Sequence, residues 1–195
     1  YRGTKPVMWS PVEKTALAEA EIEYKEVKSK SIYVAFEILS SKVTSLKNAE
    51  IIIWTTTPWT IPGNQAIAYG KKINYSLVKI LSAKNLDLLD KKYVLATELL
   101  SQVFERSEGF EYEIIKDLKE EDLEDIICSH PLKKQGFVQE VKLLEADFVD
   151  NTEGTGFVHI APAYGEDDYY LAKNNNITII DILNDNGTYK KGVPL

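Results

Sequence analysis

A threonine-rich segment, Trp54–Asn64, carries the first side chains that could do chemistry. It reads Trp-Thr-Thr-Thr-Pro-Trp-Thr-Ile-Pro-Gly-Asn, with four threonines, two prolines and two tryptophans. The hydroxyls can donate and accept hydrogen bonds, Trp59 offers an apolar wall, and the prolines stiffen the backbone. A rigid, hydroxyl-rich loop at the end of a strand suits a small binding pocket. The same composition also fits a β-branched strand end followed by a proline-stiffened turn.

A second segment, Gly154–Tyr170, supplies an imidazole and carboxylates. We expect it to run from a glycine turn through an apolar strand containing His159 into a helix. Asp167 and Asp168 fall in the first turn of that helix, where the helix dipole favours negative charge. The Gly-Thr-Gly sequence matches neither glycine-rich phosphate-binding pattern. The alternative interpretation is a core histidine followed by an ordinary helix start.

The chain lacks the sequence patterns of covalent and metal-dependent catalysis. It contains no G-x-S-x-G, no H-E-x-x-H and no C-x-x-C. Cys128 and His130 lie close together before Pro131, but this run matches no catalytic pattern, so it predicts a small core residue and a turn. The polar groups that remain favour attack by a positioned water, without a metal, over covalent catalysis.

Composition limits the broad class of the protein. The 195 residues predict one domain, and 44% hydrophobic with 27% charged residues excludes a disordered chain. The net charge of −7 argues against general nucleic-acid binding but allows a local site for the end of a nucleic acid. A single cysteine and the lack of a long apolar run predict a cytoplasmic protein without a membrane span. Because the chain starts at Tyr1 and its one methionine is Met8, we expect a fragment of a longer protein.

The elements that must position these segments are mostly strands, which predicts a mixed α+β domain built round a curled sheet. One helix is expected after Thr97 as its N-cap, and another over residues 166–173. The acidic run 111–125 predicts a solvated amphipathic helix, whereas residues 15–24 suit either a helix or a strand. Strands are expected at residues 32–38, 50–54, 65–69, 75–81, 92–96, 140–144, 156–160 and 177–183.

Both segments resemble the editing domain of isoleucyl-tRNA synthetases, which are class I aminoacyl-tRNA synthetases. Trp54–Asn64 is similar to the threonine-rich peptide of that domain, and Gly154–Tyr169 to its G-T-G-x-V-H-x-A-P and G-x-D-D-Y segment. Valyl and leucyl relatives carry Thr-Thr-Arg-Pro where this chain has Thr-Thr-Pro-Trp, which favours the isoleucyl branch. Similarity to the stretches that enter and leave the domain extends over residues 1–11, 15–24, 185–187 and 193–194.

The resemblance implies a single editing domain over residues 1–195, excised from a longer synthetase, with residues 1–25 and 186–195 as connecting segments. It implies a curled, barrel-like sheet with a few peripheral helices. The ATP-site motifs His-Ile-Gly-His and Lys-Met-Ser-Lys-Ser are absent from the chain. We therefore expect no amino-acid activation by the chain alone, with ATP and magnesium serving only the rest of the parent synthetase, which is itself an expected partner.

The activity implied by the resemblance is hydrolysis of valine wrongly attached to the 3′ end of tRNA(Ile), and also of valyl-adenylate. Valine and isoleucine differ by one methylene, which gives a binding pocket only limited discrimination between them. These synthetases are themselves the standard example of that limit. Thr55, Thr56 and Thr57 would position the ester and the attacking water near the developing oxyanion. Asp168 would pair with the α-ammonium group of the substrate, for which it matches the family pattern better than Asp167 does.

The resemblance assigns the remaining site residues to substrate binding. Trp59 and Thr60 would line the pocket, and Asn64 would hydrogen-bond the substrate or fix the loop. His159 would bound the side-chain pocket and exclude the larger isoleucyl group. Editing would need no metal and no cofactor. Two alternatives stay open: a module that binds an aminoacyl or tRNA end without turnover, and the editing domain of a valyl-type relative.

Overall fold

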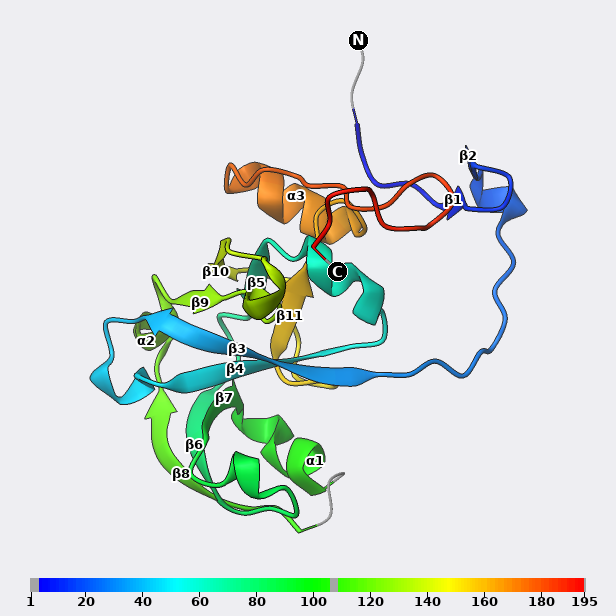
Figure 1. Cartoon of the computed structure of the whole chain (residues 1–195). Helices are drawn as coiled ribbons and strands as arrows, with labels where there is room; N and C mark the ends of the chain where they lie inside the picture. The colour runs from blue at the N-terminus through cyan, green and yellow to red at the C-terminus, as the bar shows by residue number, and fades with distance from the viewer. Residues whose placement is uncertain (1–3, 106–108, 195) are drawn as a thin grey trace.

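The computed structural model describes residues 4–105 and 109–194, and a mixed β-sheet dominates this part of the chain (Figure 1). The sheet has the strand order β11-β5-β10-β9-β3-β4-β7-β6-β8. Its strands are β3 (Ile32–Ser40), β4 (Ala49–Thr55), β5 (Ala66–Tyr69), β6 (Tyr75–Ser82), β7 (Lys92–Ala96), β8 (Glu111–Leu118), β9 (Ile127–Ser129), β10 (Glu140–Glu145) and β11 (Phe157–Ile160).

Short helices connect these strands, and a separate hairpin lies near the N-terminus. The α-helices are α1 (Leu100–Glu105), α2 (Glu120–Leu123) and α3 (Glu166–Asn174). The 3-10 helices are η1 (Glu19–Glu21), η2 (Thr44–Leu46), η3 (Pro58–Gly63), η4 (Leu86–Leu88), η5 (Thr97–Leu99) and η6 (Lys133–Gln135). The hairpin is formed by β1 (Trp9–Ser10) and β2 (Thr15–Ala16).

The sheet curls, so that its β11 edge returns over the strands β4 and β7. Strand pairs are antiparallel except β4 with β7 and β5 with β10, which are parallel. The amide of Ala96, at the end of β7, donates to the carbonyl of Thr155 just before β11 at 2.8 Å. The described strands do not close into a barrel, because β11 and β8 end the order. The predicted α+β class with a curled mixed sheet is confirmed.

The core is built from the apolar strands, as the sequence predicts. Phe36, Ile51 and Leu77 are fully buried in one large cluster between the curled parts of the sheet. Tyr75 joins this cluster and ties β11 to it, because its hydroxyl donates to the carbonyl of Gly156 at 2.6 Å. A smaller cluster lies between β5, β11 and α3. It contains Ala66, Ala68, Ala146, Val149 and Ile160, with Leu171 of α3 packed against it.

Seven of the eight predicted strands are confirmed, as is the helix predicted over 166–173. The strand predicted at 177–183 is wrong: this stretch holds only an isolated bridge from Leu183 to Tyr189. It fails as a strand because side chains satisfy its backbone groups, as when the hydroxyl of Tyr164 accepts from the amide of Ile182 at 2.7 Å.

The helix predicted over 111–125 is also wrong, because most of the run forms the edge strand β8 and only Glu120–Leu123 is helical. Backbone pairing with β6 overrides the side-chain pattern, leaving Ile114 and Ile115 exposed at 49% and 41%. Thr97 is not the predicted N-cap either. Ala96 occupies the cap position of η5, and the Thr97 hydroxyl lies 2.8 Å from that of Ser76.

Residues 15–24, for which the sequence allows either a helix or a strand, begin in β2 and continue through η1.

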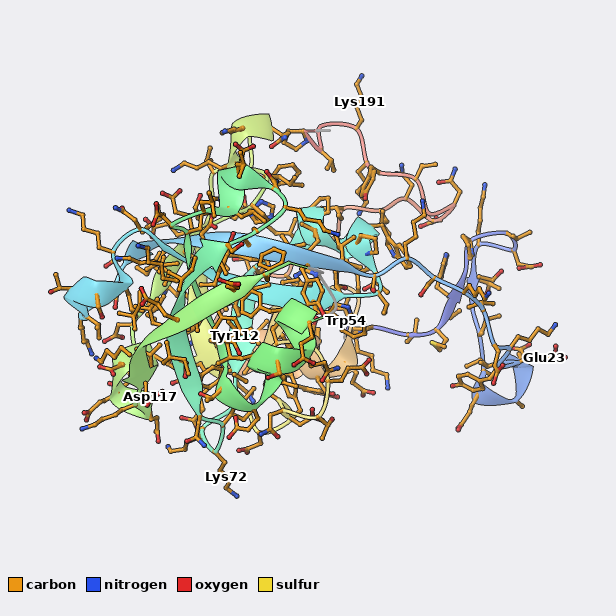
Figure 2. All side chains as sticks on the ribbon, turned by 90° about the horizontal axis from the view of Figure 1, so that it is seen from below. Glu23, Trp54, Lys72, Tyr112, Asp117 and Lys191 are labelled. Carbon is orange, nitrogen blue, oxygen red and sulfur yellow. The ribbon has the colours of Figure 1, made fainter. Side chains whose placement is uncertain are left out.

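The N-terminal and C-terminal segments lie side by side next to α3 (Figure 1). The indole N–H of Trp9 donates to the carbonyl of Asp185 at 2.8 Å. Glu23 stands on an arm away from the sheet that carries Tyr112 and Asp117 (Figure 2).

Some predicted connecting residues, 1–3 and 195, lie outside the described residues. In the part of the chain that the structure describes, no helix has the length and apolar character needed to span a membrane.

Candidate functional site

The two unusual segments of the sequence meet at one small cavity of about 190 Å³, which we call the threonine cavity. Its walls come from the end of β4, the loop through η3, strand β11 with the turn after it, and the first turn of α3. The volume suits a small aliphatic group better than a drug-sized ligand. The lining residues are Trp54, Thr55, Thr57, Thr60, Val158, His159, Ala161, Tyr164 and Asp168.

The threonine loop is held rigidly by its own hydrogen bonds. The hydroxyl of Thr55 accepts from the amide of Thr57 at 3.1 Å and lies 3.2 Å from the Thr57 hydroxyl. The Thr60 amide and hydroxyl both donate to the carbonyl of Thr57, at 3.0 and 2.8 Å. Pro58 occupies the first turn of η3, where its missing N–H leaves no helical hydrogen bond unmade. The loop thus presents two neighbouring hydroxyls, those of Thr55 and Thr57, to the cavity.

His159 reaches the same cavity from β11 and is fixed in one tautomer. The side-chain amide of Asn64 donates to His159 Nδ1 at 2.7 Å and to the carbonyl of Ala66 at 2.8 Å, which sets the orientation of the amide. His159 Nδ1 is therefore an acceptor, and its Nε2 carries the proton. This Nε2–H lies 2.9 Å from the Thr60 hydroxyl and donates to it, because that hydroxyl gives its own proton to the carbonyl of Thr57.

The charge state of His159 is set by its surroundings. Burial, followed by the nearby His130, lowers the pKa of His159 to about 4. The ring is thus neutral at neutral pH and is not poised for general acid or base catalysis there. Its hydrogen bonds hold the ring at the cavity wall and orient the Thr60 hydroxyl.

His130 lies behind this wall and supports the threonine loop, which the sequence did not indicate. Its Nε2–H donates to the carbonyl of Ile61 in η3 at 3.1 Å, its Nδ1 accepts from the amide of Leu132, and its ring stacks on Phe137. Burial lowers the pKa of His130 to about 4. Cys128 is fully buried as predicted, and burial raises the pKa of its thiol to about 12.

Asp168 supplies the negative group of the cavity. Its Oδ2 accepts from the amide of Ala161 at 2.7 Å, which aims the carboxylate at the turn after β11. Gly165 permits this position, since a Cβ there would lie 3.0 Å from Asp168 Cγ. Burial raises the pKa of Asp168, and no described residue forms an ion pair with it. Asp167 instead faces a separate cleft beside Glu145.

The structure thus brings five of the predicted site residues to one cavity: Thr55, Thr57, Thr60, His159 and Asp168. The other three do not line it. Thr56 and Trp59 are exposed, and Asn64 is fully buried behind His159, where it fixes the ring rather than reaching the cavity.

Tyr164, which the second motif places beside the pocket without a defined role, is also a wall residue of the cavity. Among the described residues, no group of three His, Cys, Asp or Glu side chains is arranged to hold a metal ion.

Residues 1–177 match the family described as tRNA synthetases class I (I, L, M and V). The chain is 45% identical over 195 residues to an isoleucine–tRNA ligase of Pelagibacter ubique, and 40% identical over 198 residues to that of Gluconobacter oxydans. In both comparisons all of this chain is covered but only 21% of the relative. The chain therefore spans about a fifth of the length of the curated relatives it matches.

Solved structures with a similar fold share little sequence with this chain. One, described as GlLeuRS-CP1, has a TM-score of 0.57 and 17% identity, covering 74% of this chain and 60% of its own. Another is the cytosolic leucyl-tRNA synthetase editing domain of P. falciparum, with a TM-score of 0.53 and 13% identity, covering 76% of this chain and 68% of its own.

Proposed function

Because the chain belongs to the class I tRNA synthetases, we propose that it is the editing domain of an isoleucyl-tRNA synthetase and hydrolyses valine wrongly attached to tRNA(Ile). The observation that carries this proposal is the threonine cavity. It places neighbouring hydroxyls, a neutral imidazole and a carboxylate without an ion-pair partner among the described residues within one small volume. The similarity of fold to leucyl-tRNA synthetase editing domains agrees with it.

The carboxylate of Asp168 recognises the α-ammonium group of the aminoacyl ester. A partly buried carboxylate with a raised pKa gains from a cation that enters the cavity, since the cation favours its charged form. The resulting charge-assisted contact fixes the amino acid at its α-carbon. The side chain of the amino acid then lies against the wall formed by His159 and Tyr164.

The hydroxyls of Thr55 and Thr57, which line the same cavity, position the reacting groups. One orients a water molecule, whose oxygen attacks the ester carbonyl, while the other donates to the developing oxyanion. The bond between the carbonyl carbon and the ribose oxygen then breaks, and the proton lost by the attacking water passes to the ribose oxygen, which releases free valine and a tRNA hydroxyl. His159 takes no proton in this sequence, because its pKa of about 4 keeps it neutral.

The acidic chain fits a substrate of which only a short end is bound. With a net charge of −7, broad contacts to a phosphate backbone are unfavourable, so the rest of the parent synthetase would hold the body of the tRNA. The same proposal includes four further points. The chain also hydrolyses valyl-adenylate, and it acts in the cytoplasm. It edits without a cofactor, and it does not activate amino acids by itself.

The test is deacylation of valyl-tRNA(Ile) and isoleucyl-tRNA(Ile) at high protein concentration by the chain and by Asp168→Asn. We expect selective release of valine, and a loss of about 10- to 100-fold in Asp168→Asn, the range for a hydrogen bond to a charged group. Asp167→Asn is the matched control, because Asp167 faces a different cleft. Valine release that Asp168→Asn leaves within threefold would contradict the assigned role. Binding without any release would favour the binding module.

A further inference from the structure

Tyr164 lines both the threonine cavity and a second cavity of about 390 Å³. The second cavity is bounded by the N-terminal segment, through Val7 and Trp9, and by the segment of residues 181–190, which we call the C-terminal segment. Tyr164 thus borders open volume in each of the two cavities. How far it can move toward the second cavity decides how large a group fits in the threonine cavity.

The hydroxyl of Tyr164 is anchored on the C-terminal segment. It donates to Asp181 Oδ1 at 3.0 Å and accepts from the amide of Ile182 at 2.7 Å. Asp181 is itself held in place, because the ammonium group of Lys190 lies 2.6 Å from its Oδ2 and the amide of Leu183 donates to its Oδ1. The ring cannot turn away from the threonine cavity without breaking both hydrogen bonds of its hydroxyl.

Two further contacts hold the ring and the threonine loop together. A Cβ at Gly63, the last residue of η3, would lie 3.0 Å from Tyr164 Cε2, so the ring packs closely on the loop. The hydroxyl of Tyr189, also in the C-terminal segment, donates to the carbonyl of Trp59 at 2.9 Å. One segment therefore fixes two walls of the same cavity.

We propose that Tyr164 is a specificity-determining residue that limits the size of the acyl side chain in the threonine cavity, and that Asp181 is the positioning residue that holds its ring there. The proposal rests on the proposed function, because the excluded group is the isoleucyl side chain. An anchored ring resists the extra methylene, whereas a ring without its anchor can retreat toward the second cavity and admit it.

The variant Tyr164→Phe tests this directly, because it keeps the ring and removes only the anchored hydroxyl. We expect the ratio of kcat/KM for isoleucyl-tRNA(Ile) to kcat/KM for valyl-tRNA(Ile) to rise about tenfold, the scale of relieving an overpacked methylene. A purely structural role would lower both values together and leave their ratio unchanged. Tyr170→Phe, on the exposed side of α3, is the control that should change neither.

Two substitutions of Asp181 distinguish a role in positioning the Tyr164 ring from a general loss of folded structure. Asp181→Ala removes the acceptor of the Tyr164 hydroxyl and should relax selectivity as Tyr164→Phe does. Asp181→Asn keeps an oxygen acceptor at the same place and should retain the selectivity of the unsubstituted chain. Equal selectivity in all of these variants would overturn the proposal.

A binding measurement distinguishes failure of this proposal from failure of the proposed function. Hydrolysis-resistant 3′-amides of valyl-adenosine and isoleucyl-adenosine are titrated into each variant by calorimetry. If the chain hydrolyses neither ester, the proposed function fails. An affinity for the isoleucyl amide that rises about tenfold in Tyr164→Phe would still support the role of Tyr164 in limiting the size of the acyl side chain. An unchanged ratio of the two affinities, or binding of neither amide by any variant, overturns it.

Discussion

Acidification from pH 7 to pH 5 is expected to destabilise the folded chain strongly, because both of its histidines are buried and neutral. The pKa values of His130 and His159 fall from 6.5 to about 4, in each case mainly through burial. The unfolded chain binds protons on these rings near pH 6.5, whereas the folded chain binds them only near pH 4. The contribution of the two histidines to the free energy of unfolding is therefore fully present above pH 6.5 and is lost as the pH falls toward 4.

The magnitude follows from the size of the two shifts. Between pH 7 and pH 5, each histidine lowers the free energy of unfolding by about 2 kcal/mol, so that both together contribute about 4 kcal/mol. This is a large fraction of the typical stability of a domain, about 5–15 kcal/mol. Asp168 acts in the opposite sense, because burial raises its pKa and its protonation on acidification favours the folded state.

The assay is urea unfolding of the chain at pH 7, 6 and 5, followed by tryptophan fluorescence and circular dichroism. His130→Gln and His159→Gln should each halve the pH dependence, and the double variant should lose most of it. Because Asp168 is present in all four proteins, its contribution cancels in these comparisons. A free energy of unfolding that changes by less than about 1 kcal/mol between pH 7 and pH 5, or the same slope in the double variant, would refute the reasoning.

Two further predictions concern packing. Gly156→Ala should destabilise the chain more than Gly154→Ala: both glycines have φ near +78°, at +76° and +79°, but only at position 156 would a Cβ collide with Ala96, at 2.4 Å. Urea unfolding should show an extra loss of about 1–3 kcal/mol for Gly156→Ala, and equal losses would contradict the close approach. Cys128 should stay unreactive toward a thiol reagent at pH 8 until urea unfolds the chain, because burial raises its pKa to about 12; labelling at the rate of a free thiol without urea would disprove this.

Local patterns in the sequence were enough to predict most of the elements that carry the site. Strand β4 follows from the run Ile51–Ile53, since a short continuous apolar run is typical of a strand buried on both faces. Helix α3 follows from its acidic first turn after Gly165. The edge strand β8 and the irregular stretch 177–183 could not be predicted in this way. Their conformations depend on hydrogen-bond partners distant in the chain, on β6 in one instance and on Tyr164 in the other.

The same division applies to the site. The two motifs identified the segments, and of the two aspartates Asp168, which the family resemblance favours, lines the threonine cavity, whereas Asp167 lines a separate cleft. The sequence could not predict which side chains face the cavity. Thr56 and Thr57 are adjacent residues of the same type, but only Thr57 lines the cavity. The choice is made by the hydrogen bonds between Thr55 and Thr57, which depend on the actual turn of the backbone.

By itself, the sequence determined the strand-rich class, the two chemical segments and the type of group each could offer, because these depend on residue identity and on spacing along the chain. Only the tertiary structure shows that Asn64 holds the His159 ring and that His130 holds the threonine loop, both from positions outside the cavity. It also shows that Tyr164 forms part of the cavity wall. Such roles arise from contacts between residues that lie many positions apart, from 18 between Tyr164 and Ile182 to 95 between Asn64 and His159. Only the folding of the curled sheet brings these residues within hydrogen-bonding distance.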